Sequence, residues 1–361
     1  MADRSSTHGP LARKRPNAVV LAVELYERRR WFAEELAEFE ALIDATGASV
    51  IAEIVQSRAR LDPAFLVGSG KARELADQIA SLEADLLFVL NPLRPRQRRA
   101  LEKLIAVPIV DRTMLILDVF ARHARSREGK LQVELAQLRY RQSNLIGIGA
   151  DLSRLGGGIG TRGPGETKLE TDRRRIGERI KALSRSLESV RRSRATRRDR
   201  NGAEPIVALV GYTNAGKSSL LNRLARSDAF VADQPFATLD PLMRRAYIGS
   251  GHFVRLVDTV GFITDLPPDL VTAFRATLEE LDAATLLLHV ADASNPNWPR
   301  QASSVDAILH DLKLSSKPRL VVLNKCDIVS EPAHAAGHLC VSAKTGAGID
   351  VLRAELRERF P

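Results

Sequence analysis

The sequence predicts an α/β protein, in which a doubly wound domain with a parallel sheet is preceded by a small α/β domain and a helical hairpin. Short apolar runs alternate with amphipathic helical patterns in both halves of the chain, as in parallel sheets covered by helices. A glycine-rich G-x-x-x-x-G-K-S segment separates one such strand from the helix that follows it. Between the two α/β regions, apolar residues recur at helical spacing on both sides of a second glycine-rich segment.

Length and composition indicate a soluble protein of two or three domains. The chain has 361 residues and is 44% hydrophobic, but no apolar run approaches the ~20 residues of a membrane helix. Residues 1–17 are polar and basic and form no secretory signal, so a disordered tail is expected. The two cysteines, Cys326 and Cys340, lack the spacing of metal ligands. We expect a cytoplasmic monomer without membrane insertion.

The first α/β domain is expected over residues 18–125. Its strands are predicted by apolar, β-branched runs and its helices by apolar residues at spacings of three and four. The strands are expected at 18–24, 48–55 and 86–90, and helices at 72–82 and 96–105, with a further helical pattern through Leu36, Phe39 and Ile43.

A basic helical hairpin with a linker is expected over residues 126–200. The first helix carries Leu131, Leu135, Leu138 and Leu145 on one face, and the second carries Leu169, Ile176, Ile180, Leu183, Leu187 and Val190. The segment between them, 154–168, is rich in glycine, and such a connection predicts two antiparallel helices.

The positive charge of the chain is concentrated in the second helix of this hairpin. Residues 173–200 hold 12 Arg or Lys against 3 Asp or Glu, a net charge of +9 where the whole chain carries +10. Such a run commonly forms a solvated helix face. Concentrated on one helix, it also fits a phosphate backbone, and the absence of aromatic residues there argues against base stacking. We therefore favour contact with the RNA backbone.

The segment 211–218 matches the phosphate-binding loop in residue type and in context. It lies between an apolar strand beginning at 205 and a helical pattern, so that backbone amides at a helix N-terminus can surround phosphates. Lys217 is expected to reach the β- and γ-phosphates and Ser218 to bind Mg²⁺. The predicted binding residues are Gly211, Tyr212, Thr213, Asn214, Ala215, Gly216, Lys217 and Ser218.

Three later segments each follow a predicted strand. After the strand 252–258, Asp258 is expected to hold Mg²⁺ through water and Gly261 to sense the γ-phosphate, with Thr259 and Val260 between them. Asn324, Lys325, Cys326 and Asp327 resemble the NKxD motif, whose aspartate pairs with guanine and not with adenine. Ser342, Ala343 and Lys344 resemble the SAK motif, which contacts the guanine base. Four motifs in this order predict a P-loop GTPase domain over 201–361.

A first switch segment is expected between the phosphate loop and Asp258. Phe236, Ala237, Thr238, Leu239 and Asp240 occupy that place in the sequence, and Thr238 is a candidate second ligand of Mg²⁺. The alternative is an ordinary loop threonine. With Lys217 and Gly261, Thr238 completes the set of catalytic candidates.

The chain also resembles the HflX family of translation-factor-related GTPases. The resemblance spans about residues 19–361 and is carried by the segments at 67–76, 110–140 and 152–176, of which LSRLGGGIGTRGPGETKLETDRRRI is the most specific. It implies GTP hydrolysis with Mg²⁺ and binding to the large ribosomal subunit through ribosomal RNA. It also implies, as in several members, the splitting or rescue of stalled or idle ribosomes.

The hydrolysis mechanism leaves alternatives open. Phe262 stands where Ras-like proteins have a water-orienting glutamine, and the resemblance implies this hydrophobic replacement, so intrinsic hydrolysis is expected to be slow. Asn214 either helps to bind K⁺, as its counterpart does in related GTPases, or hydrogen-bonds only its own loop. Two other functions compete with ribosome splitting. One is a GTP-regulated RNA-binding module, and the other is an ATP-driven RNA remodeller with a second nucleotide site at Gly68-Ser69-Gly70-Lys71.

Overall fold

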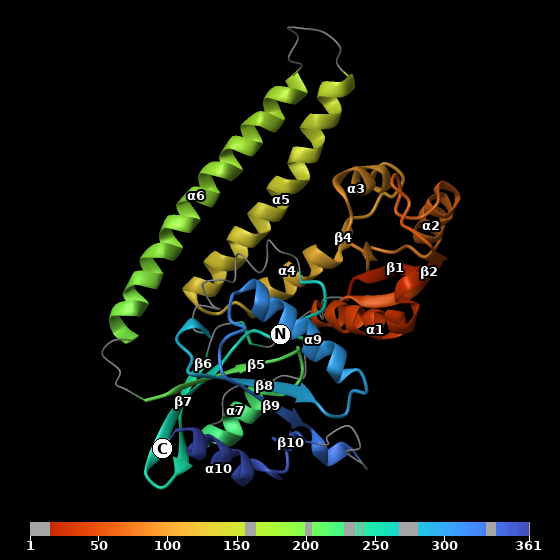
Figure 1. The fold of residues 1–361 in the computed structure, drawn as a ribbon. Helices are drawn as coiled ribbons and strands as arrows, with labels where there is room; N and C mark the ends of the chain where they lie inside the picture. The colour runs from red at the N-terminus through yellow and green to blue at the C-terminus, as the bar shows by residue number, and fades with distance from the viewer. Residues whose placement is uncertain are drawn as a thin grey trace, which may run out of the picture. The chain divides into compact units, whose positions relative to one another are not determined.

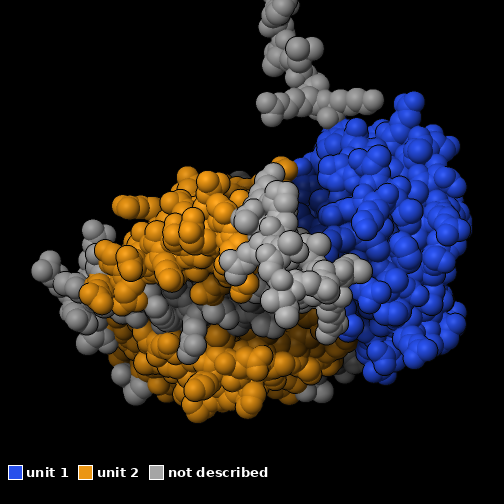
Figure 2. Space-filling view, turned by 90° about the horizontal axis from the view of Figure 1, so that it is seen from above, with its two compact units in different colours: residues 1–116 blue, residues 117–361 orange. Residues whose placement is uncertain are grey.

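The computed structural model contains two compact units, residues 1–116 and 117–361, coloured separately in Figure 2. It describes residues 15–155, 164–198, 204–226, 235–236, 238–239, 242–266, 281–329 and 337–360. Each unit holds a sheet that is wholly or mostly parallel, as the alternation of strands and helices predicts (Figure 1). No described helix is long and apolar enough to cross a membrane.

The sheet of the first unit has four parallel strands in the order β2-β1-β3-β4. The strands are β1 (Asn17–Leu25), β2 (Ser49–Arg58), β3 (Leu86–Val89) and β4 (Ile109–Asp111), and the helices are α1 (Arg29–Ala45), α2 (Ser69–Ser81), α3 (Pro95–Glu102) and α4 (Arg112–His123), which runs into the second unit. The three predicted strands and the helices α1 to α3 are confirmed. Strand β4 was not predicted, because three residues are too few to show a pattern.

The core of the first unit explains why β1 reads as a continuous apolar run. Val19, Leu21 and Val23 point to one face of the sheet and pack with Leu75 of α2 and Leu101 of α3. The residues between them are equally buried on the opposite face. Because both faces of a parallel strand are covered, the apolar residues do not alternate with polar ones.

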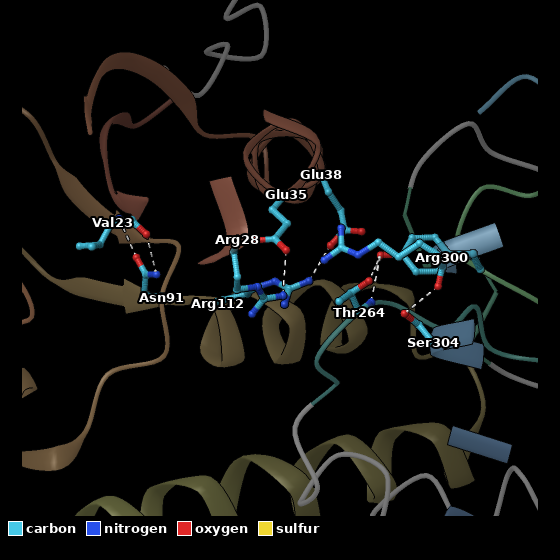
Figure 3. A network of polar contacts seen from close by, with 10 residues as sticks. Val23, Arg28, Glu35, Glu38, Asn91, Arg112, Thr264, Arg300 and Ser304 are labelled. Carbon is cyan, nitrogen blue, oxygen red and sulfur yellow. Dashed lines mark hydrogen bonds and ion pairs between the residues drawn. The ribbon is translucent and has the colours of Figure 1, made fainter. Parts of the chain in front are cut away.

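Polar contacts also connect the strands and helices of the first unit, and Figure 3 shows some of them. Asn91 makes two hydrogen bonds to Val23, accepting from its amide at 2.7 Å and donating to its carbonyl oxygen at 3.1 Å. Arg112 at the start of α4 forms an ion pair with Glu38 of α1, at 2.5 Å. Asp111, 1% exposed, pairs with Arg98 at 2.8 Å. In the basic segment around α3, at least Arg98 therefore stabilises the fold, through its ion pair with Asp111.

After the end of α4, the second unit contains a pair of long helices that lie side by side (Figure 1). These are α5 (Arg127–Leu155) and α6 (Pro164–Arg198). Their contact is formed by Leu131, Leu135, Leu138, Ile180, Leu183 and Leu187. This confirms the helix pair and the central part of the predicted apolar face. The glycine-rich connection at 156–163 and the linker at 199–203 lie outside the described residues.

The second sheet has six strands in the order β10-β9-β8-β5-β7-β6, and only the β6–β7 pair is antiparallel. The elements are β5 (Ile206–Val210), α7 (Lys217–Ala225), β6 (Leu242–Gly249), β7 (His252–Asp258), β8 (Leu286–Asp292), α9 (Trp298–Asp311), β9 (Arg319–Asn324), β10 (Leu339–Cys340) and α10 (Ile349–Arg359). Helices α7 and α10 pack on one face and α9 on the other. Both faces of the sheet are thus covered, as in a doubly wound domain.

Candidate nucleotide-binding site

The segment 211–218 joins β5 to α7 at the carboxyl edge of the second sheet. Gly211 and Gly216 have φ values of +151° and +86°. A Cβ atom would collide with the Val290 carbonyl oxygen at Gly211 and with the Asn324 side chain at Gly216. Glycine is therefore required at both positions, so that the loop can turn tightly in front of the α7 N-terminus.

Lys217 is the first residue of α7 and its ammonium group is buried inside the loop. The Nζ atom donates to the carbonyl oxygens of Tyr212 at 2.8 Å and Gly211 at 3.2 Å. Burial lowers the pKa of Lys217 to about 8, and the charge of Asp258 only partly opposes this. A buried cation held by loop carbonyls is suited to binding phosphate, because an anion offsets the cost of its desolvation.

Three oxygen-bearing side chains from separate segments meet beside Lys217. Ser218 Oγ donates to Asp258 Oδ2 at 2.5 Å and lies 2.8 Å from Thr238 Oγ1. Burial raises the pKa of Asp258, although Lys217 and both hydroxyls oppose the shift. Its second oxygen, Oδ1, is buried and has no hydrogen-bond partner among the described residues. Hydroxyl and carboxylate oxygens are the ligands that Mg²⁺ prefers, so these residues fit the ion that the sequence predicts.

The segment after Asp258 lies directly against the phosphate loop. A Cβ atom at Gly261 would come within 2.9 Å of Thr213 Cα and 3.2 Å of Lys217 Nζ, so this position also requires glycine. Phe262 and the loop are joined by two backbone hydrogen bonds, from Thr213 N to Phe262 O at 2.7 Å and from Phe262 N to Gly211 O at 3.1 Å. The Phe262 ring is 2% exposed and packs in the core under α9.

Asn324, at the end of β9, connects the phosphate loop to the 342–344 segment. Its Nδ2 atom donates to the Ala215 carbonyl oxygen at 2.9 Å, and its Oδ1 atom accepts from the Ala343 amide at 3.0 Å. The side chain is 2% exposed. Asn324 therefore positions two binding segments from the core and does not depend on ligand contact for its role.

Asp327 lies three residues after Asn324 at the sheet edge, and its side chain is exposed. Its pKa lies below the usual aspartate value, chiefly because Ser342 donates a hydrogen bond to it. Lys325 adopts the left-handed conformation with φ +65°, and its Nζ atom pairs with Asp292 Oδ2 at 2.7 Å. The carboxylate of Asp327 is thus ionised and available to two N–H donors of a guanine ring.

The structure brings most of the predicted site residues together. The remaining ones differ from each other in burial and in the contacts that they make. The Thr259 hydroxyl donates to the Leu209 carbonyl oxygen at 2.7 Å, so its side chain holds strands together. Phe236 packs against Phe120 of α4, with ring centroids 4.4 Å apart. Val260 and Leu239 are buried, and Asn214 has φ +58°. Ala237 and Asp240 lie outside the described residues.

Two residues at the site were missed by the sequence analysis. Arg223 of α7 donates from Nε to the Ala343 carbonyl oxygen at 3.0 Å and from a guanidinium nitrogen to the Lys344 carbonyl oxygen at 2.5 Å. Asp292 ends β8 and fixes Lys325. Asp292 could have been found, because it is a polar residue at a strand end on the same sheet edge. No local signal marks Arg223.

Three family models together match most of the chain, from residue 33 to residue 325. They are described as GTP-binding GTPase N-terminal over residues 33–121, GTP-binding GTPase Middle Region over 123–201 and 50S ribosome-binding GTPase over 206–325. The GTPase HflX of Caldanaerobacter subterraneus subsp. tengcongensis is 47% identical over 97% of this chain and 82% of its own length. The chain belongs to the HflX GTPase family. The GTPase HflX of Escherichia coli K12 is 44% identical over 94% of the chain and 82% of its own length.

As an HflX GTPase, the protein binds guanine nucleotides and hydrolyses GTP. A crystal structure of SsGBP in complex with GDP matches 95% of the chain and 98% of that protein, with a TM-score of 0.52 and 24% identity. At that identity the match supports the fold alone. The assignment of the nucleotide-binding residues therefore depends on the sequence motifs and on the geometry around Lys217 and Asn324.

Proposed function

We propose that this HflX GTPase holds the triphosphate of GTP between Lys217 and the amides of the phosphate loop, with its guanine at Asp327. Ser218 and Thr238 would bind Mg²⁺ directly, and Asp258 would hold it through water. The meeting of these three side chains, and the unpartnered oxygen of Asp258, support this assignment. The ion would neutralise charge on the β- and γ-phosphates during hydrolysis.

The water that attacks the γ-phosphate would be positioned without residue 262. The Phe262 ring is apolar and buried, and it cannot donate to or accept from a water molecule. The Gly261 amide would contact the γ-phosphate and report its presence. Asn214 would assist by binding K⁺ beside the phosphates. Equal hydrolysis rates in KCl and NaCl would remove that role from Asn214.

The same protein would bind the large ribosomal subunit in a nucleotide-dependent way and dissociate or rescue stalled or idle ribosomes. The observation that carries this proposal is the exposed basic surface of α6. Arg173, Arg174 and Arg175 are exposed and have no ion-pair partner among the described residues, whereas Arg179 pairs with Glu134 at 2.7 Å. Three adjacent unpaired arginines suit a phosphate backbone. The description of the matched GTPase family as ribosome-binding adds independent support.

Cosedimentation tests the nucleotide dependence. Purified large subunits are mixed with the protein in a non-hydrolysable GTP analogue or in GDP, and the bound fraction is measured. Coupling requires a different affinity in the two states, so more protein should pellet with the analogue. Equal binding in both nucleotides would contradict the proposal. Light scattering of intact ribosomes then tests dissociation, which should require the analogue or GTP.

The arginine surface has a quantitative test of its own. The logarithm of the binding constant should fall steeply with the logarithm of salt concentration, and Arg174→Gln should lower that slope by about one. Arg359→Gln in α10 is the matched control, because Arg359 is half-exposed and pairs with Glu355 within its own helix. A slope unchanged by Arg174→Gln would exclude this surface from the interface.

The burial of Phe262 also favours a second arrangement, in which GTP sets affinity for RNA and hydrolysis only resets it. The two arrangements differ in the effect of ribosomes on hydrolysis. Large subunits should accelerate hydrolysis if they complete the site. They should leave the hydrolysis rate unchanged if the protein is only a GTP-regulated binding module.

A further inference from the structure

The two cysteines of the chain lie at the two guanine-recognition segments: Cys326 is part of the 324–327 segment, and Cys340 comes two residues before the 342–344 segment. Cys326 opens a short 3-10 helix (Cys326–Ile328) directly after Lys325, and Cys340 ends β10. The Cys326 amide donates to the Val341 carbonyl oxygen at 3.2 Å, and Cys340 lies opposite Leu323 in the pairing of β10 with β9. Both side chains pack against the same small group of buried residues, Ala291, Trp298 and Leu323. Backbone pairing thus holds both thiols in place.

The surroundings of the thiols are apolar on one side and open on the other. Both side chains pack against a small cluster containing Trp298 and Leu323, and both stay partly exposed. Cys326 also donates to the Leu323 carbonyl oxygen at 3.2 Å. Burial, together with Cys340, raises the pKa of Cys326 to about 11. At neutral pH Cys326 therefore remains a thiol. The Cys340 sulfur lies 3.9 Å from the His338 carbonyl oxygen, a longer contact than that of Cys326, so we assign the first attack on an oxidant to Cys340.

We propose that Cys326 and Cys340 form an oxidation site, at which hydrogen peroxide closes a disulfide that weakens guanine-nucleotide binding. The Cys340 sulfur attacks peroxide, the O–O bond breaks, and a sulfenic acid and one water form. The Cys326 sulfur then displaces the hydroxyl group as a second water. The two thiols lose two electrons and two protons in total, and the peroxide is reduced to water. Intracellular disulfides of this kind are typically transient and redox-sensing.

Nucleotide binding should weaken because the disulfide pulls on both segments that recognise guanine. Cys326 directly precedes Asp327 in the chain, and Cys340 stands two residues before Ser342, the residue that chiefly lowers the pKa of Asp327. A disulfide requires a specific geometry, with its two sulfurs about 2 Å apart. Closing the bond should therefore displace Asp327 or Ser342. By linkage, bound nucleotide should lower the equilibrium constant for disulfide formation by the same factor by which the disulfide lowers nucleotide affinity.

The cross-link can be detected directly, because both cysteines fall in one tryptic peptide, residues 326–344. The full-length protein is treated with hydrogen peroxide, its free thiols are alkylated and it is digested. The proposal predicts an unalkylated peptide that has lost two hydrogen atoms and that dithiothreitol restores. Separate sulfenic or sulfinic acids without this peptide would overturn the proposal. Saturating GDP should slow formation of the peptide.

The effect on binding is measured by titrating a fluorescent GDP analogue into reduced and oxidised protein. Oxidation should weaken affinity roughly tenfold, the loss that follows when a hydrogen bond to a charged group is strained. Cys340→Ser is the control, because residue 340 makes no predicted nucleotide contact. Reduced Cys340→Ser should bind GDP like the reduced parent protein, and peroxide should not weaken that binding tenfold. A disulfide formed with unchanged affinity would refute the regulatory part of the proposal.

Discussion

The Tyr212 hydroxyl and the Thr264 side chain are hydrogen-bonded across the phosphate loop, with 3.0 Å between their oxygens. The same Tyr212 oxygen accepts a hydrogen bond from the Thr264 amide at 2.9 Å. Tyr212 also forms a parallel bridge with Phe262. The segment that follows Gly261 is therefore attached to the phosphate loop at Phe262 and again at Thr264. If the γ-phosphate moves Gly261 on binding, that movement must strain or break these contacts.

Replacing Tyr212 with phenylalanine should loosen this attachment and leave the loop intact. The Tyr212→Phe variant keeps the ring and removes the acceptor of the Thr264 amide, at a cost of about 1 kcal/mol. Hydrogen exchange of the Thr264 amide should accelerate several-fold, while GDP affinity changes little. Exchange at the parent rate would show that the hydroxyl does not hold this segment.

Asn324 should be essential to the arrangement of the site. Asn324→Ala leaves the buried Ala215 carbonyl and Ala343 amide without partners, at a cost of roughly 2–4 kcal/mol in unfolding free energy. GDP affinity should fall as well, because two binding segments lose their connection. Asn91→Ala is the matched control, since Asn91 likewise makes two hydrogen bonds to backbone, but in the first sheet. Asn91→Ala should lower stability without weakening GDP binding; equal losses of affinity would contradict this account of Asn324.

Nucleotide affinity should depend on pH through Lys217. Its pKa of about 8 means that the ammonium is present below pH 8 and is lost as pH rises through that value. Bound phosphate favours the charged form and raises the pKa, so affinity should be level below pH 8 and fall up to about tenfold per pH unit above it. Calorimetric titrations of GDP from pH 6.5 to 9.5 measure the profile. The Lys217→Arg variant should bind GDP more weakly, and its affinity should not decline above pH 8.

Asp327 should determine the choice of base. Asp327→Asn replaces an acceptor of two N–H donors with a group that donates on one side, so GTP affinity should fall about a hundredfold. Affinity for xanthosine triphosphate should rise, since its ring offers an acceptor at the corresponding position. Competition binding with GTP and xanthosine triphosphate measures this change in base preference. A variant with unchanged preference would remove Asp327 from base recognition.

The sequence predicts the elements of this protein better than the contacts between them. The continuous apolar run of β1 and the glycines at 211 and 216 follow from local physics, since burial on both faces and a tight turn each demand particular residue types. The roles of Arg223 and Asp292 depend on residues distant in the chain. Strand β6 pairs antiparallel at the sheet edge, where alternation is weak and only partners define the strand.

The most direct test is calorimetry of the full-length protein with Mg²⁺, comparing GDP with ADP. Asp327 at the sheet edge and Lys217 in the phosphate loop predict that GDP binds with one site per chain and that ADP binds at least about a hundredfold more weakly. Equal affinity for the two nucleotides would contradict the assignment of this site.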